Sequence, residues 1–347
     1  MNGIKLSVSG FPFSAQDGES ISCAETTVWG IMEYFGNKYA DYQPINPSKI
    51  IHVLSQHSKK RLVPSAGLTV DQISLALKEF GFGTQIYAAE NAYESELKNI
   101  ISIYIESGIP IIAALENEFV GHAVLIIGHE NDRFKHITAA TKREIEYKHI
   151  STTKKYIDYS DLPKRFIVND DNLTPYTSIS LDDPAEHYED SSIFKGCTIE
   201  SVVVPLHKKV YLDVLDAKRL ILEILADSDL GYEFAADFVF RFFLASSRSF
   251  KYHIACLSDF PTNLKDYIVG CKMPKFIWCG EFYSKENFLK KFASALILVD
   301  ATEANNVWTD SLICAGYPDR CIARLEQDFV DLPSKFVKYS KFISNLQ

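Results

Sequence analysis

One cysteine in this sequence is placed where a protein would activate a thiol. Cys23 comes directly before residues 24–36, where apolar side chains recur at the spacing of a half-buried helix. The first turn of a helix has free backbone N–H groups and the positive end of the helix dipole, and both favour a thiolate over a thiol. Because the thiolate is the nucleophilic form, the sequence predicts a reactive sulfur at Cys23.

A histidine and an aspartate further along the chain would complete a nucleophilic site. His122 follows a glycine and opens the strongly apolar, strand-like run 123–127, so we expect its ring at the mouth of a cleft. Asp170 follows the strand-like run 166–168, where a carboxylate can hold one imidazole nitrogen and fix the tautomer. These three residue types predict acyl-transfer chemistry with a thiol nucleophile and a histidine base.

The orienting role has two alternative candidates beside Asp170. Asn169 and Asp171 lie in the same polar turn and carry side chains that can also accept a hydrogen bond from imidazole. Side chains alternate along a strand, so Asp170 should share a face with Phe166 and Val168 while its neighbours face the other way. The alternation favours Asp170 and leaves the other two open.

Gln16 is the candidate side chain for an oxyanion hole. Its amide could donate a hydrogen bond together with the backbone N–H of Cys23, and residues 17–22 form a polar segment long enough to loop back over the thiol. Removing one such donor typically costs roughly 3 kcal/mol of transition-state stabilisation.

The elements that must position these residues follow an α+β order. Four helices are predicted first. One covers 24–36 and stops at Gly36, a second begins at a cap on Ser48, a third begins at a capping box on Thr69, and a fourth covers 94–105. Strands follow, and they are predicted over 109–115, 123–127, 134–137, 166–168 and 199–204. A second region begins after Pro205, with a helix near 217–225, an aromatic-rich segment 234–250, and strands 275–282 and 295–300 on either side of a helix capped by Ser284. We therefore predict two domains, residues 1–205 and an accessory α+β domain, residues 206–347.

The order and spacing of these motifs resemble the papain-like cysteine peptidase superfamily. The residues that carry the resemblance are Gln16, Ser22-Cys23-Ala24, Tyr34-Phe35-Gly36, Gly121-His122-Ala123-Val124 and Asp170. A Gly108-Ile109-Pro110-Ile111 strand before the Gly-His strand is similar to the bacterial double-glycine leader peptidase branch. The resemblance covers about residues 10–205. It implies a Cys-His-Asp triad, a helical subdomain that carries Cys23 and an antiparallel β subdomain that carries His122, followed by a C-terminal α/β region.

The composition limits the partners and the compartment. The chain has 347 residues, of which 47% are hydrophobic, and a formal net charge of −9. This acidic balance argues against nucleic acid, because phosphates demand clustered Lys and Arg. The seven cysteines lack CxxC or Cys/His ligand spacing, so no disulfide framework, zinc motif or other cofactor is expected. No apolar run is long enough for a membrane span or a signal peptide, which favours a cytoplasmic protein, and the six cysteines other than Cys23 are expected to be buried.

Three functions fit these observations. The first is a thiol hydrolase that cleaves a peptide or isopeptide bond in a peptide or protein partner. The second is a transglutaminase-like or acyltransferase enzyme that passes the acyl group from the same triad to an amine. The third is a non-catalytic binding module on a papain-like scaffold, which separation of Cys23 from His122 would favour. Nothing in the sequence specifies the substrate or the oligomeric state.

Overall fold

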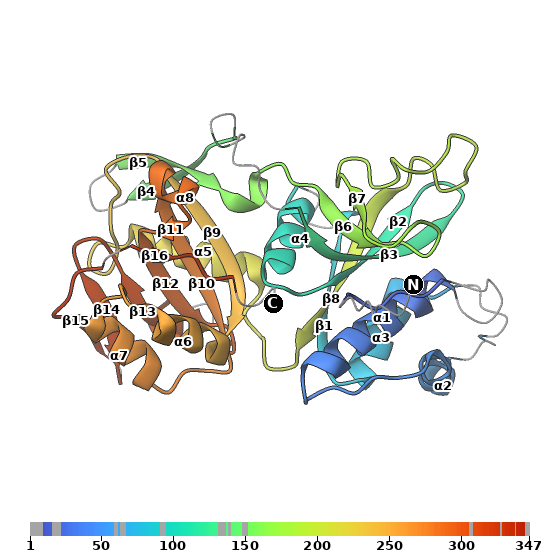
Figure 1. Ribbon diagram of the computed structural model, residues 1–347, viewed down its shortest axis with the longest axis horizontal. Helices are drawn as coiled ribbons and strands as arrows, with labels where there is room; N and C mark the ends of the chain where they lie inside the picture. The colour runs from blue at the N-terminus through green and yellow to red at the C-terminus, as the bar shows by residue number, and fades with distance from the viewer. Residues whose placement is uncertain are drawn as a thin grey trace, which may run out of the picture. The chain divides into compact units, whose positions relative to one another are not determined.

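The computed structural model describes residues 10–15, 22–58, 62, 67–90, 95–130, 137, 140–147, 152–304, 308–326, 328–336 and 338–343. The chain forms two compact units, shown in Figure 1. The first unit comprises Met1–Leu97, Ile109–Glu130 and Arg165–His207, and the second comprises Lys98–Gly108, Asn131–Lys164 and Lys208–Gln347. The predicted domains were continuous, whereas these units interleave, because the pattern of a helix or strand does not say which sheet it joins.

The first unit contains the three N-terminal helices, α1 (Cys23–Lys38), α2 (Pro47–His57) and α3 (Val70–Glu79). The predicted capping box of α3 is confirmed, since the Thr69 side chain accepts from the Gln72 N–H and Gln72 accepts from the Thr69 N–H. Helix α2 begins one residue before the predicted cap, with Pro47 in its first turn, a position where the fixed φ of proline suits a helix. Helix α1 continues two residues past Gly36.

The sheet of the first unit has six strands in the order β1-β8-β2-β3-β6-β7, and every pair is antiparallel. Its strands are β1 (Phe82–Ala88), β2 (Ile111–Glu116), β3 (Gly121–His129), β6 (Phe166–Asn169), β7 (Thr177–Ile179) and β8 (Thr198–His207). Strand β8 pairs with both β1 and β2, which confirms that the run near residue 200 belongs to the first sheet.

Helix α1 lies against β3, and α3 lies against β1 and β8. The core between these layers includes Val28 and Ile31 of α1, Leu125 of β3 and Val203 of β8, each at most 2% exposed. Alternate side chains of β3 point toward α1, so the packing holds the start of the cysteine helix beside the strand that carries His122. The expected placement of cysteine on a helix and histidine on an antiparallel sheet is therefore observed within one unit.

The second unit is built on an eight-stranded sheet in the order β15-β14-β13-β12-β10-β9-β5-β4, together with a two-stranded sheet of β11 and β16. Only β5 and β9 are parallel, so this region is α+β and not α/β. Its helices are α4 (Leu97–Glu106, whose first residue belongs to the first unit), α5 (Val214–Ala226), α6 (Ser247–Cys256), α7 (Thr262–Gly270), α8 (Lys285–Leu289) and α9 (Trp308–Ser311). Its strands are β4 (Arg143–Tyr147), β5 (Thr152–Asp158), β9 (Phe238–Ser246), β10 (Phe276–Ser284), β11 (Phe292–Ala293), β12 (Ala295–Asp300), β13 (Leu312–Gly316), β14 (Cys321–Leu325), β15 (Asp328–Leu332) and β16 (Tyr339–Ser340).

Helices cover both faces of the eight-stranded sheet. A Cβ at Gly280 of β10 would meet the Ile221 side chain of α5 at 2.7 Å, which places α5 directly on one face. Residues that point the other way, such as Cys279, share a core with Phe250 and Ile254 of α6. The aromatic-rich segment 234–250 is therefore core, as β9 and the start of α6.

The α+β class is confirmed by this architecture. Several observed strands were not predicted, and three of them, β1, β4 and β5, carry polar or charged residues among their apolar ones, which hides the strand pattern. The strand predicted over 134–137 falls mostly outside the described residues. Among the described helices, none combines the length and apolar character needed to cross a bilayer.

Candidate active site

Cys23 is the first residue of α1, as the sequence predicted, and its side chain is half-buried. The backbone N–H of Ala123, which follows His122 in β3, lies 3.4 Å from the Cys23 Sγ and donates to it. Glu25, fully buried, accepts hydrogen bonds from the N–H and the hydroxyl of Ser22 and so fixes the turn into the helix. The sulfur is thus held by backbone geometry at the helix start.

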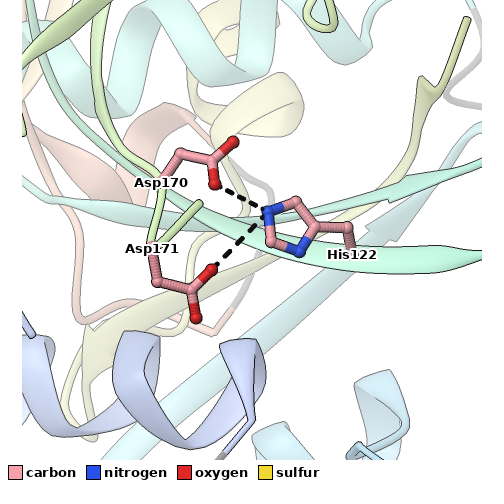
Figure 2. A group of neighbouring side chains, drawn as sticks. All are labelled: His122, Asp170 and Asp171. Carbon is pink, nitrogen blue, oxygen red and sulfur yellow. Dashed lines mark hydrogen bonds and ion pairs between the residues drawn. The ribbon is translucent and has the colours of Figure 1, made fainter. Parts of the chain in front are cut away.

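His122 is the second residue of β3 and is only 4% exposed. Its Nε2 atom lies 2.9 Å from Asp170 Oδ1 and 3.8 Å from Asp171 Oδ1, and Figure 2 shows both carboxylates facing this one ring nitrogen. The other ring nitrogen points away from both carboxylates. Burial lowers the pKa of His122, but hydrogen bonds to Asp170 and to Cys23 outweigh it and raise the pKa to about 10.

Asp170 is held as an anion by three donors. Its Oδ1 accepts from His122 and from the Asn172 N–H at 2.9 Å, and its Oδ2 accepts from the Tyr188 hydroxyl at 2.7 Å. Burial acts to raise the pKa of Asp170, but these hydrogen bonds and the charge of His122 bring it below its usual value. Asp170 is therefore the carboxyl that contacts the imidazole directly.

The pKa of Asp171 shifts in the opposite direction to that of Asp170. Burial is the main cause that raises the pKa of Asp171. The positive charge of His122 lowers it by less than burial raises it, and the negative charge of Asp170 raises it further, so the pKa of Asp171 lies above its usual value. Its Oδ2 lies 3.2 Å from the Thr26 hydroxyl, whose single proton has a closer acceptor in the Cys23 carbonyl at 2.8 Å. The Thr26 hydroxyl therefore shares its proton between two acceptors, the Cys23 carbonyl and Asp171. Environments that push the pKa values of two neighbouring carboxyls apart assign them different roles.

Two further candidate residues, Asn169 and Gln16, are not placed at the imidazole by the described structure. The Asn169 amide donates to the Pro12 carbonyl at 3.2 Å and accepts from the Tyr176 N–H at 3.1 Å, so it is occupied away from His122. Gln16 and residues 17–21 lie outside the described residues, and the oxyanion role of Gln16 stays a prediction. Just before them, Phe11 stacks on Tyr34 with ring centroids 4.8 Å apart.

Two aromatic residues beside the site were not predicted. The Phe194 ring lies 4.9 Å from the His122 ring, and Tyr188 contacts both Phe194 and the imidazole. Both come from the segment 180–197, where we predicted no site residue. Aromatic residues in an otherwise polar segment are the sequence signal that would have pointed to them.

The group of His122, Asp170 and Asp171 has the residue types of a metal site. Their three ligand atoms lie within 4.8 Å of one another, and one histidine with two carboxylates suits zinc or manganese. However, His122 Nε2 and Asp170 Oδ1 are already bonded to each other, and Tyr188 takes the second oxygen of Asp170. Asp171 Oδ1 is the one of these three ligand atoms that is buried without a hydrogen-bond partner among the described residues, so we interpret the group as a hydrogen-bonded one.

The other cysteines differ from the prediction in two cases. Four of the six are buried, namely Cys197, Cys279, Cys314 and Cys321. Cys256 is exposed and Cys271 is half-buried, because both lie at the C-terminal ends of helices that turn only one face to the core. Cys256 is therefore a second accessible thiol that any labelling experiment must remove.

Comparison with known proteins gives one solved structure to report. No family model matches the chain, and no curated protein matches it. The peptidase domain of Streptococcus ComA, a bi-functional ABC transporter involved in a quorum sensing pathway, has 12% identity and a TM-score of 0.33. The match covers 57% of this chain and 100% of that domain. A likeness at this level supports no inference about activity.

Proposed function

We propose that this protein is a papain-like thiol hydrolase that cleaves a peptide or isopeptide bond in a peptide or protein partner. The observation that carries the proposal is that the His122 ring lies 2.9 Å from Asp170, while the N–H of the next residue, Ala123, lies 3.4 Å from the Cys23 sulfur at a helix start. A nucleophile, a base and a group that orients the base are the three parts of a thiol triad.

The proposed reaction has two steps. The Cys23 thiolate attacks the carbonyl carbon, a C–S bond forms, and protonated His122 gives its proton to the departing amine as the C–N bond breaks. Water then attacks the thioester while His122 takes a proton from it, and cleavage of the C–S bond releases the acid and restores the thiolate. Asp170 keeps the imidazole in position throughout, and Gln16 with the Cys23 N–H would hold the oxyanion.

Acyl transfer to an amine is the alternative that uses the same residues. Product mass separates the two reactions, because hydrolysis adds water to the cleaved acyl group and transfer adds the amine. A non-catalytic module is less favoured, since the Cys23 sulfur lies 3.4 Å from the N–H of the residue that follows His122.

The test compares the accessible thiols. Cys256→Ser removes the exposed one, and the variant is treated with limiting iodoacetamide at pH 6, followed by peptide mapping. We expect Cys23 to be alkylated roughly tenfold or more faster than Cys271, and His122→Gln to remove this advantage, because the imidazole acts as the base that takes the proton of the attacking thiol. Incubation with a peptide library should then show cleavage that Cys23→Ala abolishes. Equal alkylation of Cys23 and Cys271, with no cleavage, would contradict the proposal.

A further inference from the structure

We propose that Tyr188 is a positioning residue for this reaction, which acts by holding Asp170 in register with His122. The inference rests on the proposed function, because it assigns Tyr188 a role in the same triad. Tyr188 touches no reacting atom. It belongs to the segment between β7 and β8, residues 180–197, hereafter the 180–197 loop.

The Tyr188 hydroxyl has an unusual pair of contacts for a loop residue. It donates to Asp170 Oδ2 at 2.7 Å and lies 3.4 Å from the Asn172 amide, which donates to it. Tyr188 is only 9% exposed, and a buried phenol with a carboxylate acceptor makes a charge-assisted bond that is stronger than a neutral one. With Oδ2 taken by Tyr188, Asp170 presents its Oδ1 to the imidazole.

The ring of Tyr188 also helps to enclose the imidazole. Its centroid lies 6.4 Å from that of His122 in an edge-on arrangement, and Phe194 lies 5.2 Å from Tyr188 and 4.9 Å from His122. These aromatic rings keep water from the bond between His122 and Asp170. A hydrogen bond between charged groups is stronger in such a low-dielectric setting.

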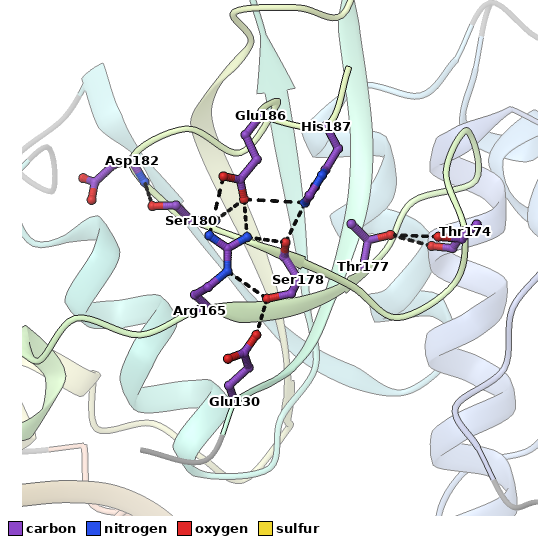
Figure 3. A network of polar contacts seen from close by, with 9 residues as sticks. All are labelled: Glu130, Arg165, Thr174, Thr177, Ser178, Ser180, Asp182, Glu186 and His187. Atoms are coloured by element: carbon purple, nitrogen blue, oxygen red, sulfur yellow. Dashed lines mark hydrogen bonds and ion pairs between the residues drawn. The ribbon is translucent and has the colours of Figure 1, made fainter. Parts of the chain in front are cut away.

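The 180–197 loop is itself tied to the sheet directly before Tyr188. Figure 3 shows Glu186 paired with Arg165, which also donates to the Ser178 carbonyl at 2.6 Å. The Ser180 N–H donates to Glu186 at 3.1 Å, and the His187 ring lies 2.7 Å from the same Ser178 carbonyl. These contacts fix residues 186 and 187 against β7, so the position of the next residue, Tyr188, is determined by the sheet that also carries His122.

The experiment uses iodoacetamide as the probe, so it requires no substrate. In the Cys256→Ser background, Tyr188→Phe removes the hydroxyl and keeps the ring. We expect alkylation of Cys23 to slow by roughly three- to tenfold near pH 6, the scale of one ordinary intramolecular hydrogen bond, because Asp170 keeps its other two donors. The acid limb of the rate against pH should move to higher pH, because Asp170 loses a donor that lowers its pKa. A merely structural tyrosine would lower the rate equally at every pH.

Two controls make the test specific. Tyr42→Phe alters another buried tyrosine of the same unit, one that stacks on Phe82, and should leave the profile unchanged. Adding Tyr188→Phe to Asp170→Asn should cost no further rate, because the hydroxyl acts through the Asp170 carboxylate.

The outcomes separate this inference from the proposed function. An unshifted acid limb in Tyr188→Phe, or an equal further loss in the Asp170→Asn background, overturns the inference while the fast alkylation of Cys23 in the parent still supports the triad. Slow alkylation of Cys23 in the parent itself overturns the proposed function. Thermal unfolding of each variant shows whether the fold is kept.

Discussion

Asp170 and Asp171 allow a matched pair of substitutions that decides which carboxyl orients His122. Asp170→Asn and Asp171→Asn each replace a carboxyl by an amide of the same shape. Asp170 accepts from three donors, one of them the imidazole at 2.9 Å, whereas Asp171 Oδ1 lies 3.8 Å from the same nitrogen. We expect only the first substitution to slow the reaction.

The magnitude follows from the charge that each variant removes. A hydrogen bond to a charged group contributes about 1.5–3 kcal/mol and a neutral one about 0.5–1.5 kcal/mol. Asp170→Asn keeps an acceptor for imidazole but loses the charge, a difference of about 1.4 kcal/mol, or roughly tenfold in rate. Asp171 Oδ1 lies 3.8 Å from the imidazole nitrogen, which is beyond hydrogen-bond distance, so Asp171→Asn removes no hydrogen bond to His122 and should stay within about twofold of the parent.

The assay is the rate of Cys23 alkylation at pH 6 in the Cys256→Ser background, followed by kcat on any peptide that the parent cleaves. Circular dichroism melts establish that both variants are folded. If Asp171→Asn is the slower variant, Asp171 orients the imidazole and the assignment of Asp170 is wrong. If both variants match the parent, neither carboxyl contributes through its charge.

The remaining predictions concern stability. The pKa of His122 is raised from 6.5 to about 10, so its contribution to stability is fully present below pH 6.5 and is lost as the pH rises toward 10. The urea midpoint of the parent should therefore fall over this pH range, and the midpoint of His122→Gln should fall less. In the second unit, buried Arg241 binds Glu106 and Glu281, each at 2.6 Å. Arg241→Met should therefore cost about 3–5 kcal/mol of unfolding free energy, whereas the exposed control Arg219→Met should cost less than about 1 kcal/mol; equal costs in denaturant titrations would refute the buried network.

Local features of the fold could be predicted because their causes lie within a few residues. The apolar spacing after Cys23 marks α1, and Thr69 with Gln72 marks the start of α3. The strand that begins at Gly121 and the one that ends at Asn169 follow from short apolar runs next to polar turns. The division into units did not follow, because β5 pairs with β9, which is far away in the sequence, and β4 joins the same sheet by pairing with β5.

The sequence alone was enough to place Cys23 at the start of a helix and His122 at the start of a strand, since helix starts and strand starts are local. Only the tertiary structure decided which carboxyl meets the imidazole. The register between β3 and β6 shifts between Ile126 and Gly128, and a shift of this kind changes which residue after the strand faces His122. It also decided that Tyr188 reaches Asp170, because a contact between two loops depends on the sheet that holds both of them and not on any local pattern.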